Sequence, residues 1–139
     1  MATNGTTPTT ITATTPDRDE IVRVVQLYFD GFGKGDAGRF REAFHEDAWI
    51  FYTDADGVLH NGPLTDRFES WATGGGDFEG RVIAVTQAGD VASVLLRLTN
   101  LADASDSWVD FHALLRVDGT WKITNKTSTH SSRAAWAKG

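Results

Sequence analysis

Apolar and polar residues alternate from Trp108 to Lys126 with the period of two that a half-buried strand requires. Asp118-Gly119, near the middle of this stretch, is a strong hairpin signal. If Val117 joins them in a three-residue loop, one strand face holds Phe111, Ala113, Leu115, Trp121, Ile123 and Asn125, and the other holds Asp110, His112, Leu114, Arg116, Lys122 and Lys126. A two-residue turn would mix polar and apolar side chains on each face. The pattern therefore favours the three-residue loop with a bulge, and it leaves Asn125 as the single polar residue on the apolar face.

Helical spacing dominates the first half of the chain. A first amphipathic helix is predicted from Ile21, Val24, Val25, Tyr28 and Phe32, with Thr15 or Asp17 as its N-cap and Glu20 completing a capping box. Asp36 is expected to cap a short second helix that buries Phe40, Ala43 and Phe44 and ends at His45. A third helix, over residues 63–73, would present Leu64, Phe68 and Trp71.

Strands are expected at residues 49–53, 58–60, 80–86 and 91–99, before the hairpin already described. The strand over 91–99 has an apolar face of Ala92, Val94, Leu96 and Leu98. Helices followed by antiparallel hairpins indicate the α+β class, with a curved mixed or antiparallel sheet and three N-terminal helices on its concave face. Residues 17–130 would form this one domain, between a disordered Thr-rich tail at 1–16 and a C-terminal tail at 131–139.

Composition excludes several classes of function. The net charge is −6 and Lys and Arg do not cluster, so nucleic acid and membranes are not expected partners. There is no apolar run of membrane-spanning length and no signal-peptide pattern at the start, which favours a cytoplasmic location. The sequence has no Cys, and its four His are not spaced as metal ligands, so neither a metal nor another cofactor is expected.

Several short motifs resemble those of one superfamily. They are Tyr28 and Phe32 in the first helix, Gly35-Asp36, residues 44–48, residues 89–92 and residues 118–126. Together they are similar to the nuclear transport factor 2-like superfamily, and the last two are most similar to its lumazine-binding-like branch. The resemblance implies a cone-shaped fold. It does not fix a function, because this superfamily includes SnoaL-like cyclases, isomerases, binding proteins and docking modules.

The resemblance also guides the search for catalytic residues. The two acids of ketosteroid isomerase-like members fall near Tyr52 and Ala113, which disfavours that chemistry. Scytalone dehydratase-like members pair the counterpart of Asp36 with a mid-chain His, but no His lies between Asn61 and Phe111, so Asp36 is better explained as a helix cap. SnoaL-like cyclases use an Asp and a His on the long strands, as Asp110 and His112 could here. Alternatively, Asp110 pairs with Lys126 on the outer face as ordinary sheet stabilisation.

Large side chains are expected to project between helices and sheet, where they either fill the core or line a ligand site: Tyr28, Phe32, Tyr52, Phe68, Trp71, Phe111 and Trp121. Asn125 would then read the polar edge of the ligand. The favoured hypothesis is a protein that binds a largely apolar or aromatic small molecule in the cone cavity.

Two alternatives remain open. One is a cofactor-free lyase, isomerase or cyclase that uses Asp110–His112 or Tyr52 for proton transfer. The other is a dimerisation or docking module. A homodimer is expected through the outer sheet face, with Leu95, Arg97 and Leu114 on that face.

Overall fold

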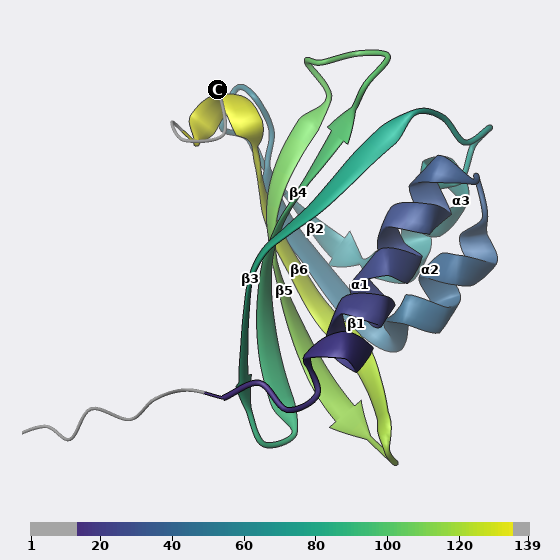
Figure 1. Ribbon diagram of the computed structural model, residues 1–139. Helices are drawn as coiled ribbons and strands as arrows, with labels where there is room; N and C mark the ends of the chain where they lie inside the picture. Colours follow the sequence, from purple (N-terminus) through teal and green to yellow (C-terminus); the bar gives the residue numbers. More distant parts are fainter. Residues whose placement is uncertain (1–13, 135–139) are drawn as a thin grey trace, which may run out of the picture.

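The computed structural model describes residues 14–134, which fold as helices packed on one face of a six-stranded sheet (Figure 1). The helical elements are α1 (Arg18–Gly33), α2 (Ala37–Ala43), η1 (Leu64–Asp66), α3 (Phe68–Trp71) and η2 (Ser131–Arg133). The strands are β1 (Phe44–Thr53), β2 (Leu59–Pro63), β3 (Phe78–Ala88), β4 (Val91–Asn100), β5 (Ser107–Val117) and β6 (Thr120–His130). Residues 1–13 and 135–139, which hold most of the two expected tails, lie outside the described part.

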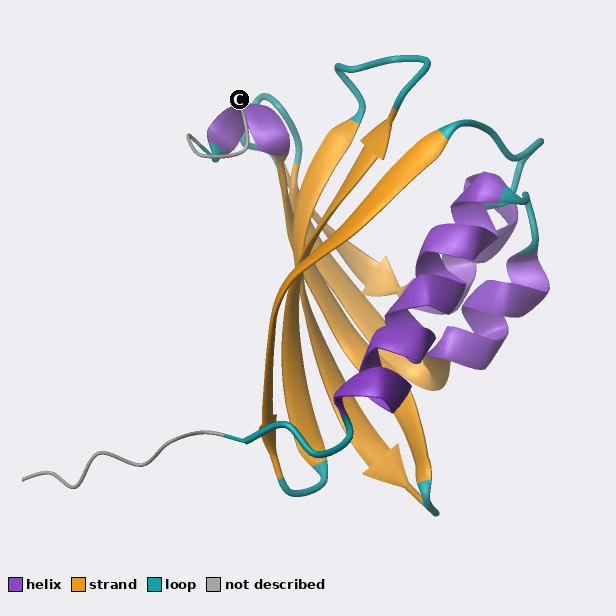
Figure 2. Cartoon of the chain, in the orientation of Figure 1, coloured by secondary structure: helices purple, strands orange, loops and turns teal. Residues whose placement is uncertain are grey.

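The sheet has the order β2-β1-β6-β5-β4-β3, and its neighbours are antiparallel except for the parallel pair β1 and β6. Its long strands twist and curve so that one face is concave, and α1, α2 and α3 cover that face (Figure 2). The expected α+β architecture, with a mixed sheet and helices on the concave side, is therefore confirmed. No helix among the described residues has the length and apolar character needed to cross a membrane.

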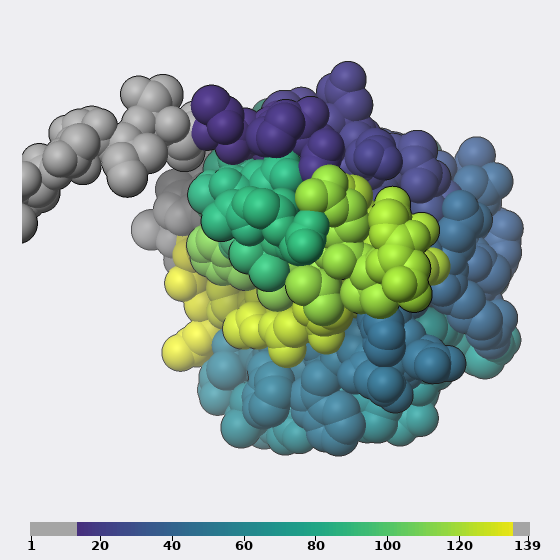
Figure 3. Space-filling view, turned by 90° about the horizontal axis from the view of Figure 1, so that it is seen from below, coloured from purple at the N-terminus to yellow at the C-terminus, as the bar shows by residue number. Residues whose placement is uncertain are grey.

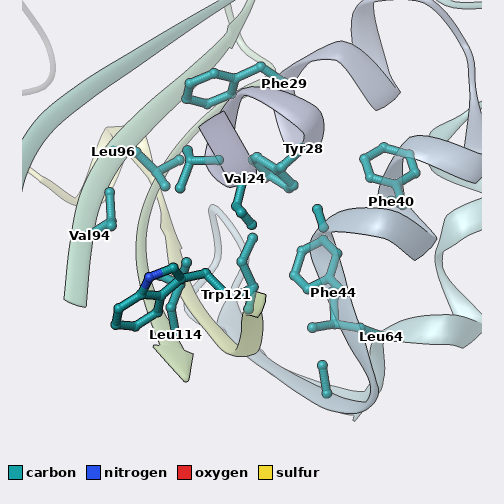
Figure 4. Packing of buried hydrophobic residues seen from close by; sticks show 14 of the residues in the cluster. Val24, Tyr28, Phe29, Phe40, Phe44, Leu64, Val94, Leu96, Leu114 and Trp121 are labelled. Atoms are coloured by element: carbon teal, nitrogen blue, oxygen red, sulfur yellow. The ribbon is translucent and has the colours of Figure 1, made fainter. Parts of the chain in front are cut away.

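The core lies between α1 and the concave face (Figure 4). Val24, Tyr28 and Phe29 project from α1 toward the sheet, and Val94, Leu96 and Leu114 meet them from β4 and β5. The alternation predicted for β4 is confirmed, since Ala92, Val94, Leu96 and Leu98 are all buried.

Two helix boundaries differ from expectation. Phe44 takes an extended conformation at the end of α2 and begins β1, so His45 lies in a strand and not at a helix end. The third helix is replaced by the 3-10 turn η1 and the single turn α3, because Arg67 interrupts the helix between them. Asp36 caps α2 as expected, with its carboxylate accepting the N–H of Gly38 at 2.9 Å.

Asp17 occupies the N-cap position of α1, but its side chain makes no capping hydrogen bond. Its carboxylate instead accepts hydrogen bonds from Gln87 at 2.8 Å and Arg116 at 2.6 Å. The start of the described chain thus rests against the β3–β4 and β5–β6 turns, as the view from below shows (Figure 3). A tertiary contact replaces the expected local cap.

The expected register of the last hairpin was wrong. Asp118 and Gly119 have φ of 51° and 78°, so both are left-handed and form a two-residue turn. Val117 pairs with Thr120, and the register shifts later in the hairpin. Ala113 pairs with Asn125 and Leu114 with Ile123, so Thr124 is the extra residue of a bulge in β6. The bulge was thus expected at the turn, whereas it lies within the strand.

This register reverses the faces that were expected for β5. Asp110, His112 and Leu114 are buried on the concave face, while Phe111, Ala113 and Leu115 are exposed on the convex face. Since β-strand side chains alternate, the change of register exchanged every residue of β5 between the two faces. On β6, Trp121 and Ile123 remain buried as expected. The bulge shifts the alternation by one residue, so Lys126 is the next side chain to point to the concave side.

Candidate active site

A pocket of about 500 Å³ opens between α3 and the concave face of the sheet. Its walls come from α1, β1, the segment from Arg67 to Phe78, the ends of β4 and β5 with the loop between them, and one residue of β6. Aromatic rings supply much of the lining: Phe32, Tyr52, Trp71, Phe78 and Trp108. Charged groups are also present, with Arg67, Asp77, Asp106 and Lys126 facing the same space. Such a mixture of apolar walls and a few polar groups is typical of a small-molecule site.

Beside this pocket lies a buried polar cluster centred on Asp110, which has no exposed surface. One carboxylate oxygen, Oδ2, is 2.9 Å from the Tyr28 hydroxyl, 3.1 Å from His112 Nε2 and 3.3 Å from Lys126 Nζ. An ionised carboxylate only accepts hydrogen bonds, so the proton of His112 is on Nε2. Lys126 Nζ also donates to Ser128 Oγ at 2.6 Å. Side chains of three elements, α1, β5 and β6, thus converge on one carboxylate.

The strand geometry explains why these residues meet. Asp110 and His112 lie two apart on β5, so they share a face, and their partners across the ladder are Ser128 and Lys126. Tyr28 reaches the same point from α1, with its ring edge-on to the His112 ring at a centroid distance of 4.7 Å. The alternative that Asp110 and Lys126 form an outer-face pair is therefore wrong in its location, although the two do form an ion pair.

Burial and charge act against each other within the cluster. Burial raises the pKa of Asp110, but the Lys126 charge and the hydrogen bond from His112 outweigh it, so the pKa lies well below its usual value. Burial lowers the pKa of Lys126 and of His112, while Asp110 opposes both shifts. Burial and the neighbouring Asp110 raise the pKa of Tyr28. The cluster therefore holds an ionised Asp110, a neutral His112 and a Lys126 ammonium that loses its proton more readily than an exposed lysine.

Lys126 connects the cluster to the pocket. Its side chain is only 6% exposed, yet it is among the residues that line the pocket. Nζ lies 5.4 Å from the centre of the Trp71 ring and 5.9 Å from that of Tyr28, at distances where aromatic faces stabilise a cation. Asp110 and His112 stand behind it. Within the described chain, Asp110 Oδ1 and His112 Nδ1 are buried without a hydrogen-bond partner.

Tyr52 lies in the pocket wall, as the sequence suggested. Its hydroxyl accepts a hydrogen bond from Arg67 at 3.2 Å, and the guanidinium carbon of Arg67 lies 5.4 Å from its ring centre. His60 stacks on the Tyr52 ring, with ring centroids 4.7 Å apart, and its Nε2 lies 2.9 Å from Asp54 Oδ2. The position of Tyr52 is thus fixed by contacts with both Arg67 and His60.

The other candidate binding residues divide into three groups. Phe32 and Trp71 line the pocket. Tyr28, Phe68 and Trp121 are buried in the packed core. Phe111 and Asn125 are not brought to the pocket: Phe111 is 56% exposed on the convex face, and Asn125 donates to the Trp49 carbonyl at 3.1 Å. Asn125 had been expected on the cavity side because uninterrupted alternation on β6 would place it with Trp121 and Ile123, and the bulge at Thr124 breaks that alternation.

Sequence reasoning missed Lys126 and Arg67 as pocket residues. The strong preference of Asp-Gly for a two-residue hairpin turn could have shown that Asp110 and His112 lie on the inner face. The bulge that then moves Lys126 beside them leaves no clear mark in the sequence. Arg67 lies in the segment that was assigned to one long helix, so its position at a helix break was not visible. Within residues 14–134, His, Cys, Asp and Glu form no group of three or more arranged to hold a metal ion.

The curved sheet, the helices on its concave face and the pocket between them define the class of protein, a nuclear transport factor 2-like domain. Residues 16–128 match the model of the family described as "Putative lumazine-binding", and the chain belongs to this family. The resemblance deduced from the sequence motifs is thereby confirmed.

Three proteins are similar to this chain over most of its length. Aldolase FrzH from a Cladobotryum species is 24% identical over 115 residues, which cover 81% of this chain and 90% of that protein. A nuclear transport factor 2-like protein from Methylobacillus flagellatus is 28% identical, with a TM-score of 0.74 over 84% of this chain and 93% of that one. Another, from Shewanella baltica, is 27% identical, with a TM-score of 0.72 over 83% and 95%. Both solved structures are described as having unknown function.

Proposed function

We propose that the protein is a cofactor-independent enzyme that binds a small, largely apolar carbonyl compound and moves a proton at the carbon beside the carbonyl group. The observation that carries this proposal is the Lys126 ammonium, which lines an aromatic pocket while the buried Asp110 carboxylate holds it. A buried ion pair seldom stabilises a fold more than apolar side chains of the same volume would. Its presence at a pocket therefore favours a role in chemistry.

The sequence pattern alone had favoured binding without turnover, because no carboxylate or His was expected on the cavity side. The observed register removes that argument, since Asp110 and His112 are both on the concave face. Their role differs from the one first considered. They stand behind Lys126 and position it, so the group that meets the ligand is the lysine.

Each part of the pocket has a task in such a reaction. When a proton leaves the carbon beside a carbonyl, negative charge develops on the carbonyl oxygen, and the Lys126 ammonium can stabilise it. Asp77 and Asp106 line the same pocket and supply proton acceptors. This step is common to isomerases and to aldol-type lyases. The similarity to a protein named an aldolase supports the proposal.

Binding without turnover is the second candidate, favoured by the aromatic walls. Phe32 and Trp71 have ring centroids 5.2 Å apart, and Phe32 and Phe78 5.4 Å, so flat apolar surfaces surround the cavity. A planar ring system would pack well against them.

Hydrogen–deuterium exchange separates the two candidates. The protein is incubated in D2O with phenylacetone and with 2-tetralone, and exchange beside the carbonyl is followed by NMR. We expect exchange above the buffer rate in the natural protein and its loss in Lys126→Met. Lys122→Met is the matched control, since Lys122 lies on the same strand and donates to the Glu42 carbonyl away from the pocket. If the ketones quench the fluorescence of pocket Trp residues but no exchange exceeds that of buffer, the protein is a binder and the enzymatic proposal is wrong.

A further inference from the structure

Lysine chemistry in the pocket can go beyond the stabilisation of charge. An amine that is desolvated among apolar groups becomes a nucleophile toward carbonyl carbon. Lys126 Nζ is the one primary amine among the lining residues that the structure describes. Its neighbours there are the ring of Trp71, the Ser128 hydroxyl and the Asp110 carboxylate.

We propose that Lys126 is a covalent catalytic residue that forms a Schiff base with an aryl-bearing aldehyde or ketone in this pocket. The inference rests on the proposed function and specifies its substrate class and its intermediate. It also explains why residue 126 is a lysine, because an arginine would stabilise a negative charge equally well but could not form a Schiff base.

The environment of Nζ suits both ends of the reaction. Before it, the nitrogen is an ammonium 3.3 Å from Asp110 Oδ2 and beside the Trp71 ring. Afterwards the nitrogen belongs to an iminium that carries the same positive charge. Asp110 therefore remains a counter-ion throughout, and no new charge has to be buried during the reaction. Tyr28 and His112 hold the carboxylate from two further directions, which fixes its position relative to Nζ.

The chemical step balances without any oxidant or reductant. Nζ first releases one proton to a carboxylate of the pocket, Asp77 or Asp106, and its electron pair forms a bond to the carbonyl carbon while the π pair moves to oxygen. The nitrogen then gives a second proton to that oxygen, and the first returns to it, so that the C–O bond breaks and water leaves. One ammonium and one carbonyl compound thus yield one protonated Schiff base and one water. The positive nitrogen then acidifies the neighbouring C–H bonds, which is the activation that the proposed function requires.

The lowered pKa of Lys126 also favours the proposed reaction. Burial lowers the pKa of Lys126, and the nearby charge of Arg67 lowers it further, against the opposing effect of Asp110. Each unit by which a lysine pKa falls increases the neutral fraction at pH 7 about tenfold. Lys126 should therefore react with carbonyl compounds faster than the exposed lysines of the same chain.

Reductive trapping tests the inference on the full chain. The protein is incubated at neutral pH with phenylacetone, benzaldehyde or benzoylacetone, and sodium cyanoborohydride reduces any Schiff base formed with the first two. Peptide mapping by mass spectrometry then locates the adduct among Lys34, Lys122, Lys126 and Lys138. We expect the labelling rate of Lys126 to be at least about tenfold that of Lys122. Benzoylacetone should give a stable enaminone absorption that Lys126→Met lacks and Lys122→Met retains.

The outcomes distinguish this inference from the proposed function. If exchange beside the carbonyl is lost in Lys126→Met but no probe labels Lys126 in the natural protein, Lys126 acts through charge and the Schiff base is wrong. If Lys126 is labelled selectively and no exchange occurs, the covalent site stands and the proton-transfer function falls. Labelling of all lysines at similar rates overturns the inference, because uniform labelling would show that Lys126 is no more reactive than the other lysines. Since trapping is measured on the natural protein, the result does not depend on whether a variant folds.

Discussion

Asp110 is the carboxylate around which the buried polar side chains of the concave face are arranged. Its Oδ2 atom receives Tyr28, His112 and Lys126, and none of these four groups has more than a few per cent of its side-chain surface exposed. Within such a cluster, removal of one partner leaves the other charge buried and unpaired. Asp110 thus holds Lys126 Nζ in position and is also its counter-ion.

Replacement of Asp110 tests this dependence. We expect Asp110→Asn to lower the free energy of unfolding by about 3–5 kcal/mol, because the Lys126 ammonium would lose its counter-ion. The double variant Asp110→Asn/Lys126→Met should recover much of the loss, since it removes the unpaired charge. Urea unfolding followed by circular dichroism measures both. Equal stability of Asp110→Asn and the natural protein would show that the ion pair contributes little.

Helix α1 packs against α2 through a close approach that needs a glycine. A Cβ built at Gly31 would lie 2.5–2.7 Å from three ring atoms of Phe40, which is fully buried among other aromatic rings. At Gly33, two residues further along, the nearest atom to such a Cβ is the Gly76 carbonyl oxygen at 4.0 Å. The two glycines therefore form a matched pair on one helix.

Gly31→Ala should destabilise the protein by about 1–3 kcal/mol, because the Phe40 ring cannot move without disturbing its neighbours. Gly33→Ala should be neutral or should stabilise by up to about 1 kcal/mol, as alanine favours helix and meets open space. Thermal unfolding of the two variants gives the comparison. If Gly31→Ala were as stable as Gly33→Ala, the α1–α2 contact would be looser than described.

At the level of elements, the sequence predicted what periodicity controls and missed what depends on tertiary contact. The core face of α1 and the buried face of β4 follow directly from residue spacing. The faces of β5 depend on the hairpin turn, and the strongest local cue there was the Asp-Gly dipeptide itself. The rule that the inner face of a strand is uniformly apolar favoured the other turn. That rule gives the wrong faces where a fold buries a polar cluster, as it does around Asp110. A functional site is where such a rule is most often broken.

The helix break at Arg67 shows the same limit. Residues 63–73 carry apolar residues at helical spacing, so one continuous helix was a reasonable prediction. In the structure the segment bends between η1 and α3, and the bend aligns Arg67 and Trp71 with the pocket. Packing against the sheet decides such a bend, and local spacing alone does not record it.

The convex face of the molecule carries a band of apolar side chains. Phe51, Phe111 and Leu95 lie in one row across β1, β5 and β4, with Thr127 of β6 between Phe51 and Phe111. Trp49 and Leu115 lie nearby, 40% and 37% exposed. Leu114, which had been expected on this face, is instead in the core. An exposed band of this kind is typical of a protein–protein interface.

We therefore keep the expectation of a homodimer through this face as a proposal. Sedimentation equilibrium at micromolar concentration should show a dimer, and Phe111→Lys should weaken it about tenfold or more, because it places a charge within the band. Val58→Lys is the control, as Val58 is 53% exposed in the β1–β2 connection away from the row. A monomer at these concentrations, or equal dimerisation of the two variants, would contradict the proposal.

The parallel pairing of β1 and β6 also determines how the chain must fold. Trp49 and Asn125 are neighbours in the sheet but 76 residues apart in sequence, and β1 otherwise contacts only the short strand β2 along its edges. A two-stranded ribbon is barely stable alone, so we expect the β1–β2 pair to be unstable until β6 is available to pair with β1. Contacts of such separation slow folding, because the chain entropy is lost before the contact is gained. We therefore expect β1 and β6 to pair late in folding, and Lys126 reaches the concave face with this same strand.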